Sequence, residues 1–293
     1  MFDSIDQTLE TLSARAYVAD VGLATSLFLA IRMHKALFVE GEPGVGKTEI
    51  AKVVAAALDA PLIRLQCYEG LDISHAVYEW NYARQLLALQ SGEVVGHAAA
   101  GVFTEEFLIR RPLLQAIDAS RERTPVLLID ELDRADEEFE SFLLELLSDF
   151  QITIPELGTL VAKHKPVVII TSNRTREVHD ALKRRCVYHW IDYPAPATEL
   201  AIVRARLPQA SARLAEQVVA FVQRTREHDF YKLPGVAETL DWVEALTLLG
   251  STELTPHVVS ATIGILLKYQ DDVDRMRAGL ADELVGGARA AAS

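Results

Sequence analysis

The 293-residue chain is half hydrophobic and carries a formal net charge of -13. This apolar content excludes an intrinsically disordered chain, and the length suffices for a full core and a second small domain. The acidic balance argues against broad electrostatic binding to nucleic acid or to anionic membranes, so we expect neither as a partner.

The sequence predicts a cytoplasmic protein without a membrane span. Two distant cysteines, Cys67 and Cys186, lack metal-like spacing and indicate reduced thiols. Residues 1–11 are acidic, whereas a secretory signal needs a basic start followed by an apolar block. The longest apolar candidate, residues 21–31, is too short to cross a bilayer and is typical of a helix packed on a core.

In chain order, two predicted helices over 3–15 and within 18–34 are followed by five short apolar runs. These runs are predicted strands over 36–40, 61–66, 126–130, 167–172 and 187–193. Three of them lack polar alternation, which is typical of strands buried on both faces of a parallel sheet. The segments between the runs are long enough for helical crossovers. We therefore predict an α/β fold with a five-stranded parallel sheet covered by helices.

A proline pair at Pro194 and Pro196 ends this pattern, and the remaining sequence has helical periodicity only. It predicts four helices, the last over 256–276. We expect an αβα core over 1–193, a small all-helical domain over 194–277, and a flexible tail over 278–293.

The segment Gly41-Glu42-Pro43-Gly44-Val45-Gly46-Lys47-Thr48 lies between the first predicted strand and a predicted helix over 48–58. Glycines let the backbone fold around phosphates and direct N–H groups at them, and a helix begins with its positive dipole end. In this pattern Lys47 reaches the β- and γ-phosphates of ATP, and the Thr48 hydroxyl holds Mg²⁺. A ligand-free turn is the alternative, but strand, loop and helix all fall where a nucleotide site needs them.

The third predicted strand ends in Asp130, followed by Glu131. Ligands of open α/β sheets bind at the carboxyl ends of strands. We expect Asp130 to hold the Mg²⁺ shell through water and Glu131 to deprotonate the attacking water. The alternative is an acidic first turn of a helix.

Two further candidates follow. Asn173 ends the fourth predicted strand and is expected to bind the γ-phosphate or the attacking water, with a simple helix cap as the alternative. Arg184 and Arg185 precede the fifth strand, where basic residues usually serve as partners of a helix end. The sharper interpretation is an arginine that reaches the γ-phosphate of a neighbouring subunit, and we favour Arg185, although the sequence does not separate it from Arg184.

These elements, in this order and followed by a helical domain, resemble the AAA+ ATPases. The segments 37–48 and 129–135, with a hairpin-like insertion, look like the MoxR family, and segments 67–73, 78–82 and 184–194 resemble its CoxD-type branch. The resemblance implies a ring, usually a hexamer, with ATP at subunit interfaces. It also implies a hairpin at 151–161 and an insertion over about 72–107 facing the pore or substrate. Val18, with its neighbours Tyr17 and Ala19, looks like the residues that flank the adenine in relatives, and an ordinary buried helix start is the alternative.

One departure concerns the helical domain. MoxR relatives usually carry an arginine there as a second nucleotide sensor, but the matching stretch, Pro234 to Thr239, contains none. No second-sensor residue is therefore assigned.

The expected function is Mg²⁺-dependent ATP hydrolysis that drives remodelling of a protein client. The resemblance implies a maturation chaperone for a molybdenum-containing enzyme of the carbon monoxide dehydrogenase type, working with a partner that has a von Willebrand factor A domain. Two alternatives are a nucleic-acid-directed AAA+ motor and a nucleotide switch with negligible turnover. Glu131 argues against the switch, because a pure sensor does not need a carboxylate that activates water.

Overall fold

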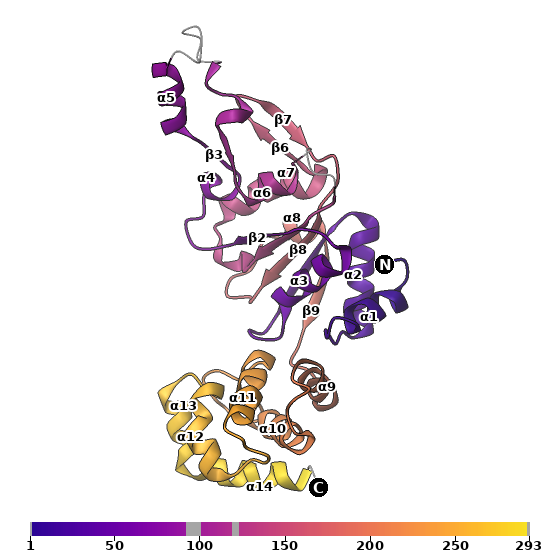
Figure 1. The fold of residues 1–293 in the computed structure, drawn as a ribbon, viewed down its shortest axis with the longest axis vertical. Helices are drawn as coiled ribbons and strands as arrows, with labels where there is room; N and C mark the ends of the chain where they lie inside the picture. The colour runs from indigo at the N-terminus through magenta and orange to yellow at the C-terminus, as the bar shows by residue number, and fades with distance from the viewer. Residues whose placement is uncertain (1, 92–100, 119–122, 292–293) are drawn as a thin grey trace. The chain divides into compact units, whose positions relative to one another are not determined.

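The computed structural model describes residues 2–91, 101–118 and 123–291, which divide into two compact units (Figure 1). The first unit comprises residues 1–11, 20–40 and 48–190. The second comprises residues 12–19, 41–47 and 191–293. Each unit has a hydrophobic core of its own.

A five-stranded parallel sheet forms the centre of the first unit, in the order β2-β5-β8-β1-β9. Its strands are β1 (Ala36–Gly41), β2 (Leu62–Gln66), β5 (Val126–Asp130), β8 (Val167–Ser172) and β9 (Cys186–Ile191). All five coincide with predicted strands to within two residues at each end. The α/β fold class predicted from the apolar runs is confirmed.

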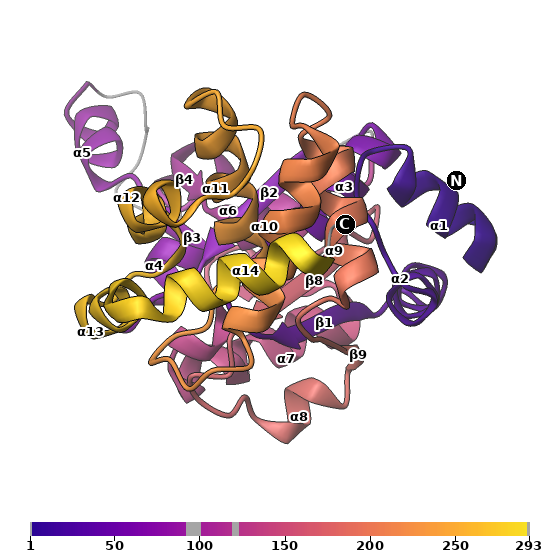
Figure 2. The same cartoon turned by 90° about the horizontal axis from the view of Figure 1, so that it is seen from below.

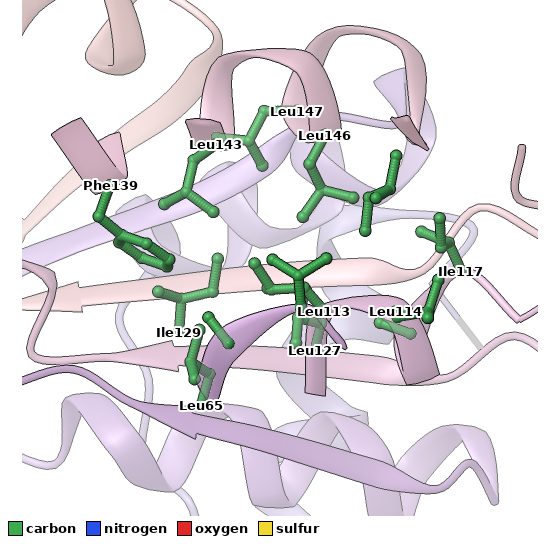
Figure 3. Close-up of a cluster of buried hydrophobic side chains, with 14 of the residues drawn as sticks. Leu65, Leu113, Leu114, Ile117, Leu127, Ile129, Phe139, Leu143, Leu146 and Leu147 are labelled. Atoms are coloured by element: carbon green, nitrogen blue, oxygen red, sulfur yellow. The ribbon is translucent and has the colours of Figure 1, made fainter. Parts of the chain in front are cut away.

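The central strands are buried on both faces, as their unbroken apolar sequences predict. Leu127 and Ile129 of β5 pack in a cluster with α6 (Pro112–Ala116) and α7 (Glu137–Asp149), where Leu143 and Leu146 point toward the sheet (Figure 3). The alternate residue Leu128 has no exposed surface either. Burying one such leucine side chain stabilises a fold by about 1.5–3 kcal/mol, so the strand is held firmly in register.

The strand register brings several carboxyl ends to one edge of the sheet. Gln66 at the end of β2 lies opposite Asp130 at the end of β5, and Glu40 of β1 lies opposite Ser172 at the end of β8. This edge is where open α/β sheets bind ligands.

The remaining elements of the first unit surround the sheet or extend from it. They are α1 (Ile5–Ser13), α2 (Val21–Met33), α3 (Lys47–Leu58), α4 (Ile73–Ala76), β3 (Tyr78–Trp80), α5 (Tyr82–Ser91), β4 (Leu108–Arg110), β6 (Gln151–Ile154), β7 (Gly158–Val161) and α8 (Asp180–Lys183). Helix α2 begins where the Asp20 carboxylate accepts the Leu23 N–H at 2.6 Å. The antiparallel pair β6–β7 is the hairpin expected at 151–161. In the expected insertion, β3 pairs with β4, and residues 92–100 lie outside the described residues.

The second unit is helical beyond β9. Its helices are α9 (Pro196–Arg206), α10 (Ala212–Thr225), α11 (Val236–Leu248), α12 (Pro256–Leu266), α13 (Gln270–Arg275) and α14 (Ala281–Ala291). The fully buried Trp242 lies at its centre, with its ring 5.2 Å from that of Phe221 and its indole N–H donating to Thr262 at 2.8 Å.

Helix α14 corrects the prediction of a flexible tail over 278–293. It packs against α10 (Figure 2). It buries an apolar stripe that includes Leu284, Val285 and Ala288. Many alanines and glycines at a chain end favour fraying, but small residues also allow close helix packing, and here the packing prevails. The predicted helix over 256–276 is divided into α12 and α13 around residues 267–269. Within the described residues, no helix is both long enough and apolar enough to span a bilayer.

Candidate active site

The segment between β1 and α3 has the backbone of a phosphate-binding loop. Gly44 and Gly46 have φ values of 76° and 93°, in the left-handed region that glycine adopts without strain. The Lys47 ammonium is buried and donates to the carbonyl oxygens of Gly41 and Glu42, both at 2.7 Å. Since Lys47 also begins α3, the loop ends at the positive end of a helix dipole. The loop can therefore bind an anion with backbone N–H groups and one ammonium.

This loop packs closely against the start of α11, and the two segments belong to one compact unit. The Ala237 N–H donates to the Gly44 carbonyl at 3.0 Å. A Cβ atom at Gly235 would lie 2.6 Å from the Pro43 carbonyl oxygen, and one at Gly44 would lie 2.8 Å from Glu238. The close approach thus requires glycine on both sides.

Asp130 is 2% exposed, and both of its carboxylate oxygens accept hydrogen bonds. Oδ1 accepts from the hydroxyls of Thr48 at 2.9 Å and Thr171 at 2.6 Å, and Oδ2 accepts from Arg64 Nε at 3.0 Å and Nη2 at 2.6 Å. A hydroxyl and a carboxylate in contact are hard oxygen donors, and Mg²⁺ usually takes one or two such protein ligands and completes its shell with waters and phosphates. Thr48 and Asp130 therefore fit the metal predicted for them.

Glu131 lies beside this carboxylate with an unusual backbone conformation, φ 56° and ψ 51°, in the left-handed region. Its N–H donates to Thr171 Oγ1 at 2.9 Å. Its side chain accepts from Gln66 Nε2 at 3.1 Å and Asn173 Nδ2 at 3.4 Å, and pairs with Arg134 Nε at 2.9 Å. The sequence-predicted Glu131 and Asn173 are thus brought together, and donors hold the carboxylate from several sides.

Five residues of this site were not assigned from the sequence: Arg64, Gln66, Asp133, Arg134 and Thr171. Asp133 is 3% exposed and accepts from the backbone N–H of Asn173 at 3.1 Å and of Thr175 at 2.9 Å, so it fixes the turn after β8. Thr171 is a polar residue inside a buried strand, which is a signal that could have identified it. The role of Arg64 and Gln66 depends on the pairing of β2 with β5, which sequence pattern does not give.

The two candidate arginines differ in their surroundings. Arg185 donates from Nε to Ser148 Oγ at 2.7 Å and from Nη1 to the Ala181 carbonyl at 2.8 Å. Arg184 caps α8 and is exposed, and no hydrogen bond or ion pair of its guanidinium occurs among the described residues. Arg185 is therefore the more firmly held of the two.

Val18 is half-buried in the connection between α1 and α2. Its neighbour Tyr17 lies beside the phosphate loop, with ring atom Cε2 4.0 Å from the position of a Cβ on Gly46. The stretch around Val18 therefore borders the loop, and the role of Val18 beside the adenine stays a prediction.

A buried ion pair supports the segment that lacks the second-sensor arginine. Arg226, with its side chain 7% exposed, donates to both carboxylate oxygens of Glu199 at 2.7 and 2.8 Å and to the Pro234 carbonyl at 2.8 Å. Glu199 has no exposed surface and also accepts from the hydroxyl of Thr239 at 2.8 Å. The pair holds both ends of the 234–239 segment that packs on the phosphate loop.

Cys67 follows β2 and its N–H donates to the Asp130 carbonyl at 2.8 Å. Burial, reinforced by the negative charges of Asp130, Asp133 and Glu131, raises the pKa of its thiol to about 12. The thiol is therefore protonated at neutral pH and is a poor nucleophile.

Residues 36–186, from β1 to the first residue of β9, match the family model described as AAA domain (dynein-related subfamily). The chain belongs to this AAA domain family. The matched region contains the phosphate loop, Asp130, Glu131, Asn173 and both candidate arginines.

Curated relatives of this AAA domain protein include chaperones. It is 33% identical to chaperone protein ClpB 2 of Parasynechococcus marenigrum over 136 residues, 45% of this chain and 13% of that protein. It is 25% identical over 264 residues to YehL of Escherichia coli, an uncharacterised protein, covering 85% of this chain and 67% of YehL. The chain thus spans only a small part of the ClpB proteins that it matches.

Among solved structures, the AAA domain protein is similar to a mutant of RuvB from Thermotoga maritima. The TM-score is 0.50 at 18% identity, over 92% of this chain and 72% of that one. At this identity the similarity supports the fold alone, and it agrees with the α/β architecture described above.

Proposed function

We propose that the protein is a Mg²⁺-dependent ATPase. The observation that carries the proposal is the 2.9 Å contact between the Thr48 hydroxyl and the Asp130 carboxylate, directly after the phosphate loop and beside Glu131. Thr48 and Asp130 would hold Mg²⁺, which would offset the negative charge of the phosphates. Since phosphoryl transfer leaves the protein little covalent chemistry, positioned charges supply most of the catalysis.

In this mechanism the phosphate loop binds the triphosphate. Lys47 exchanges its two hydrogen bonds to the loop carbonyls for bonds to the β- and γ-phosphates. Its buried ammonium therefore has hydrogen-bond partners both without and with ATP. Glu131 takes the proton of the attacking water, and Gln66 and Asn173 hold its carboxylate in place.

The binding step is tested by calorimetry with Mg·ATP. We expect Lys47→Ala to weaken affinity at least about 100-fold, because it removes the ammonium paired with the phosphates. Lys52→Ala is the matched control: Lys52 lies on the same helix, is exposed and pairs with Glu49, so the variant should bind as the wild type does. Absence of Mg·ATP uptake by the wild-type protein would overturn the proposal.

We further propose that the protein assembles into a ring, of six subunits in the resembled family, and that an arginine acts on ATP bound by the neighbour. Arg185→Ala is then expected to lower turnover of the ring by about 10³-fold. Mixing Arg185→Ala with Glu131→Gln subunits should restore turnover, because some interfaces then combine an intact Arg185 with an intact Glu131.

Arg184→Ala, assayed in the same way, decides between the adjacent arginines. Arg185 is bonded within its own subunit, whereas Arg184 is exposed at the end of α8. Rescue confined to one of the two mixtures assigns the residue, and the absence of rescue in both would contradict action between subunits.

Remodelling of a protein client is the proposed purpose of hydrolysis. The similarity to ClpB chaperones and the resemblance to the CoxD-type branch of the MoxR family support this role. The proposed client is a molybdenum-containing enzyme of the carbon monoxide dehydrogenase type, and the proposed partner has a von Willebrand factor A domain. ATP bound differently in two subunit arrangements would supply the work.

A further inference from the structure

Arg64 lies on β2, the edge strand next to β5. Burial alternates along this strand: Ile63 and Leu65 are buried, whereas Arg64 and Gln66 are exposed. Because strand side chains alternate between faces, Arg64 and Gln66 extend from the same face. The register places Gln66 opposite Asp130, so both side chains lie at the carboxylates of the candidate active site.

The guanidinium of Arg64 contacts two groups with different roles. Nε and Nη2 donate to Asp130 Oδ2 at 3.0 and 2.6 Å, and Nη2 also donates to Gln66 Oε1 at 2.6 Å. The other end of the same amide, Gln66 Nε2, donates to Glu131 Oε2 at 3.1 Å. An unbroken series of hydrogen bonds therefore connects the metal-side carboxylate to the carboxylate of the proposed base.

The order of donors in this series fixes the Gln66 amide. A guanidinium has donors only and a carboxylate has acceptors only, so the amide fits between them in one orientation. With Oε1 on Arg64, the NH₂ group must face Glu131. Among the described residues only Arg64 donates to Oε1, so without Arg64 the amide loses the contact that fixes its rotation.

We propose that Arg64 is a positioning residue for hydrolysis, which orients the Gln66 amide so that Gln66 holds Glu131 where it can act on water. This role rests on the proposed ATPase function. The simpler alternative is that Arg64 only neutralises Asp130, which is 2% exposed while the Arg64 side chain is 52% exposed. The two roles differ in what a lysine can replace: an ammonium supplies the charge but lacks the planar fork that engages both partners.

The kinetic test compares Arg64→Ala, Arg64→Lys, Gln66→Ala and the double alanine variant. We expect each single change to lower kcat about 10- to 100-fold with KM for ATP within about twofold, since the base is misplaced while the phosphate loop is intact. The double variant should lose no more than Gln66→Ala alone, because residues that act through one another are not additive. Arg204→Ala is the control, since Arg204 has similar exposure and forms an exposed pair with Glu216 at 2.7 Å.

Full kcat in Arg64→Ala, recovery in Arg64→Lys, or multiplied losses in the double variant would each overturn the positioning role. The ATPase proposal would survive any of these results if the wild-type protein hydrolyses ATP and the Glu131→Gln variant does not. Wild-type protein without turnover would overturn the ATPase proposal and this role with it.

A second measurement needs no turnover. In ¹⁵N-labelled protein without nucleotide, the Gln66 side-chain amide signals are those that disappear in Gln66→Ala. We expect both Arg64 variants to shift these signals and Arg204→Ala to leave them unchanged. Signals that do not move in Arg64→Ala would contradict the contact on which the role depends.

Discussion

Glu131→Gln is expected to bind Mg·ATP within about twofold of the wild-type affinity while hydrolysis falls about 10²- to 10⁴-fold. Glutamine has nearly the same shape as glutamate, so the contacts around Glu131 lose little packing. It has no basic oxygen to take a proton from water, so the chemical step loses its base. Calorimetry and single-turnover assays on one preparation measure the two effects separately.

Glu137→Gln is the matched control, because Glu137 is an exposed carboxylate in the first turn of α7. Wild-type turnover in Glu131→Gln would remove Glu131 from the role of base.

Because the inactive variant should stay loaded with ATP, it also tests the proposed client. A purified molybdenum hydroxylase should be retained by Glu131→Gln with ATP and released without nucleotide.

Glu199→Ala is expected to destabilise the second unit by about 3–5 kcal/mol, the usual cost of removing one partner of a buried ion pair. The substitution leaves the Arg226 guanidinium buried without its carboxylate and removes the acceptor of the Thr239 hydroxyl. Urea denaturation followed by tryptophan fluorescence measures the change, since Trp242 is buried in the same unit.

The exposed pair of Arg204 and Glu216 provides the control, because Arg204→Ala should cost no more than about 1 kcal/mol. A similar decrease in the free energy of unfolding in both variants would show that burial does not make the Glu199–Arg226 pair more important for stability than an exposed pair. Because the pair also bonds Pro234 beside the phosphate loop, ATP affinity of Glu199→Ala should fall even where the protein is folded.

The sheet was predictable from sequence because its strands are buried on both faces and lack polar alternation. Leu127, Leu128 and Ile129 are consecutive and fully buried, which no surface strand or amphipathic helix would show. The C-terminal helix was not predictable in the same way. Its stripe of Leu284, Val285 and Ala288 is short, and only its packing against α10 makes the helix a core element.

The candidate site divides along a similar line. Local patterns predict Lys47, Thr48, Asp130 and Glu131, because the glycine-rich loop and the acidic strand end that identify them each span only a few residues of the chain. Arg64 meets Asp130 only through strand pairing, across 66 positions of sequence. Single-sequence patterns carry no information on such pairing, so the residues that orient the predicted groups emerge only from the fold.

The left-handed backbone of Glu131 has an evolutionary consequence. Glycine or asparagine would adopt this conformation more easily, by about 1 kcal/mol for a residue of this kind. A lineage freed from selection for turnover would therefore gain stability by drifting to either residue. In the proposed ATPase, selection for turnover would keep glutamate at this position despite its cost in folding stability.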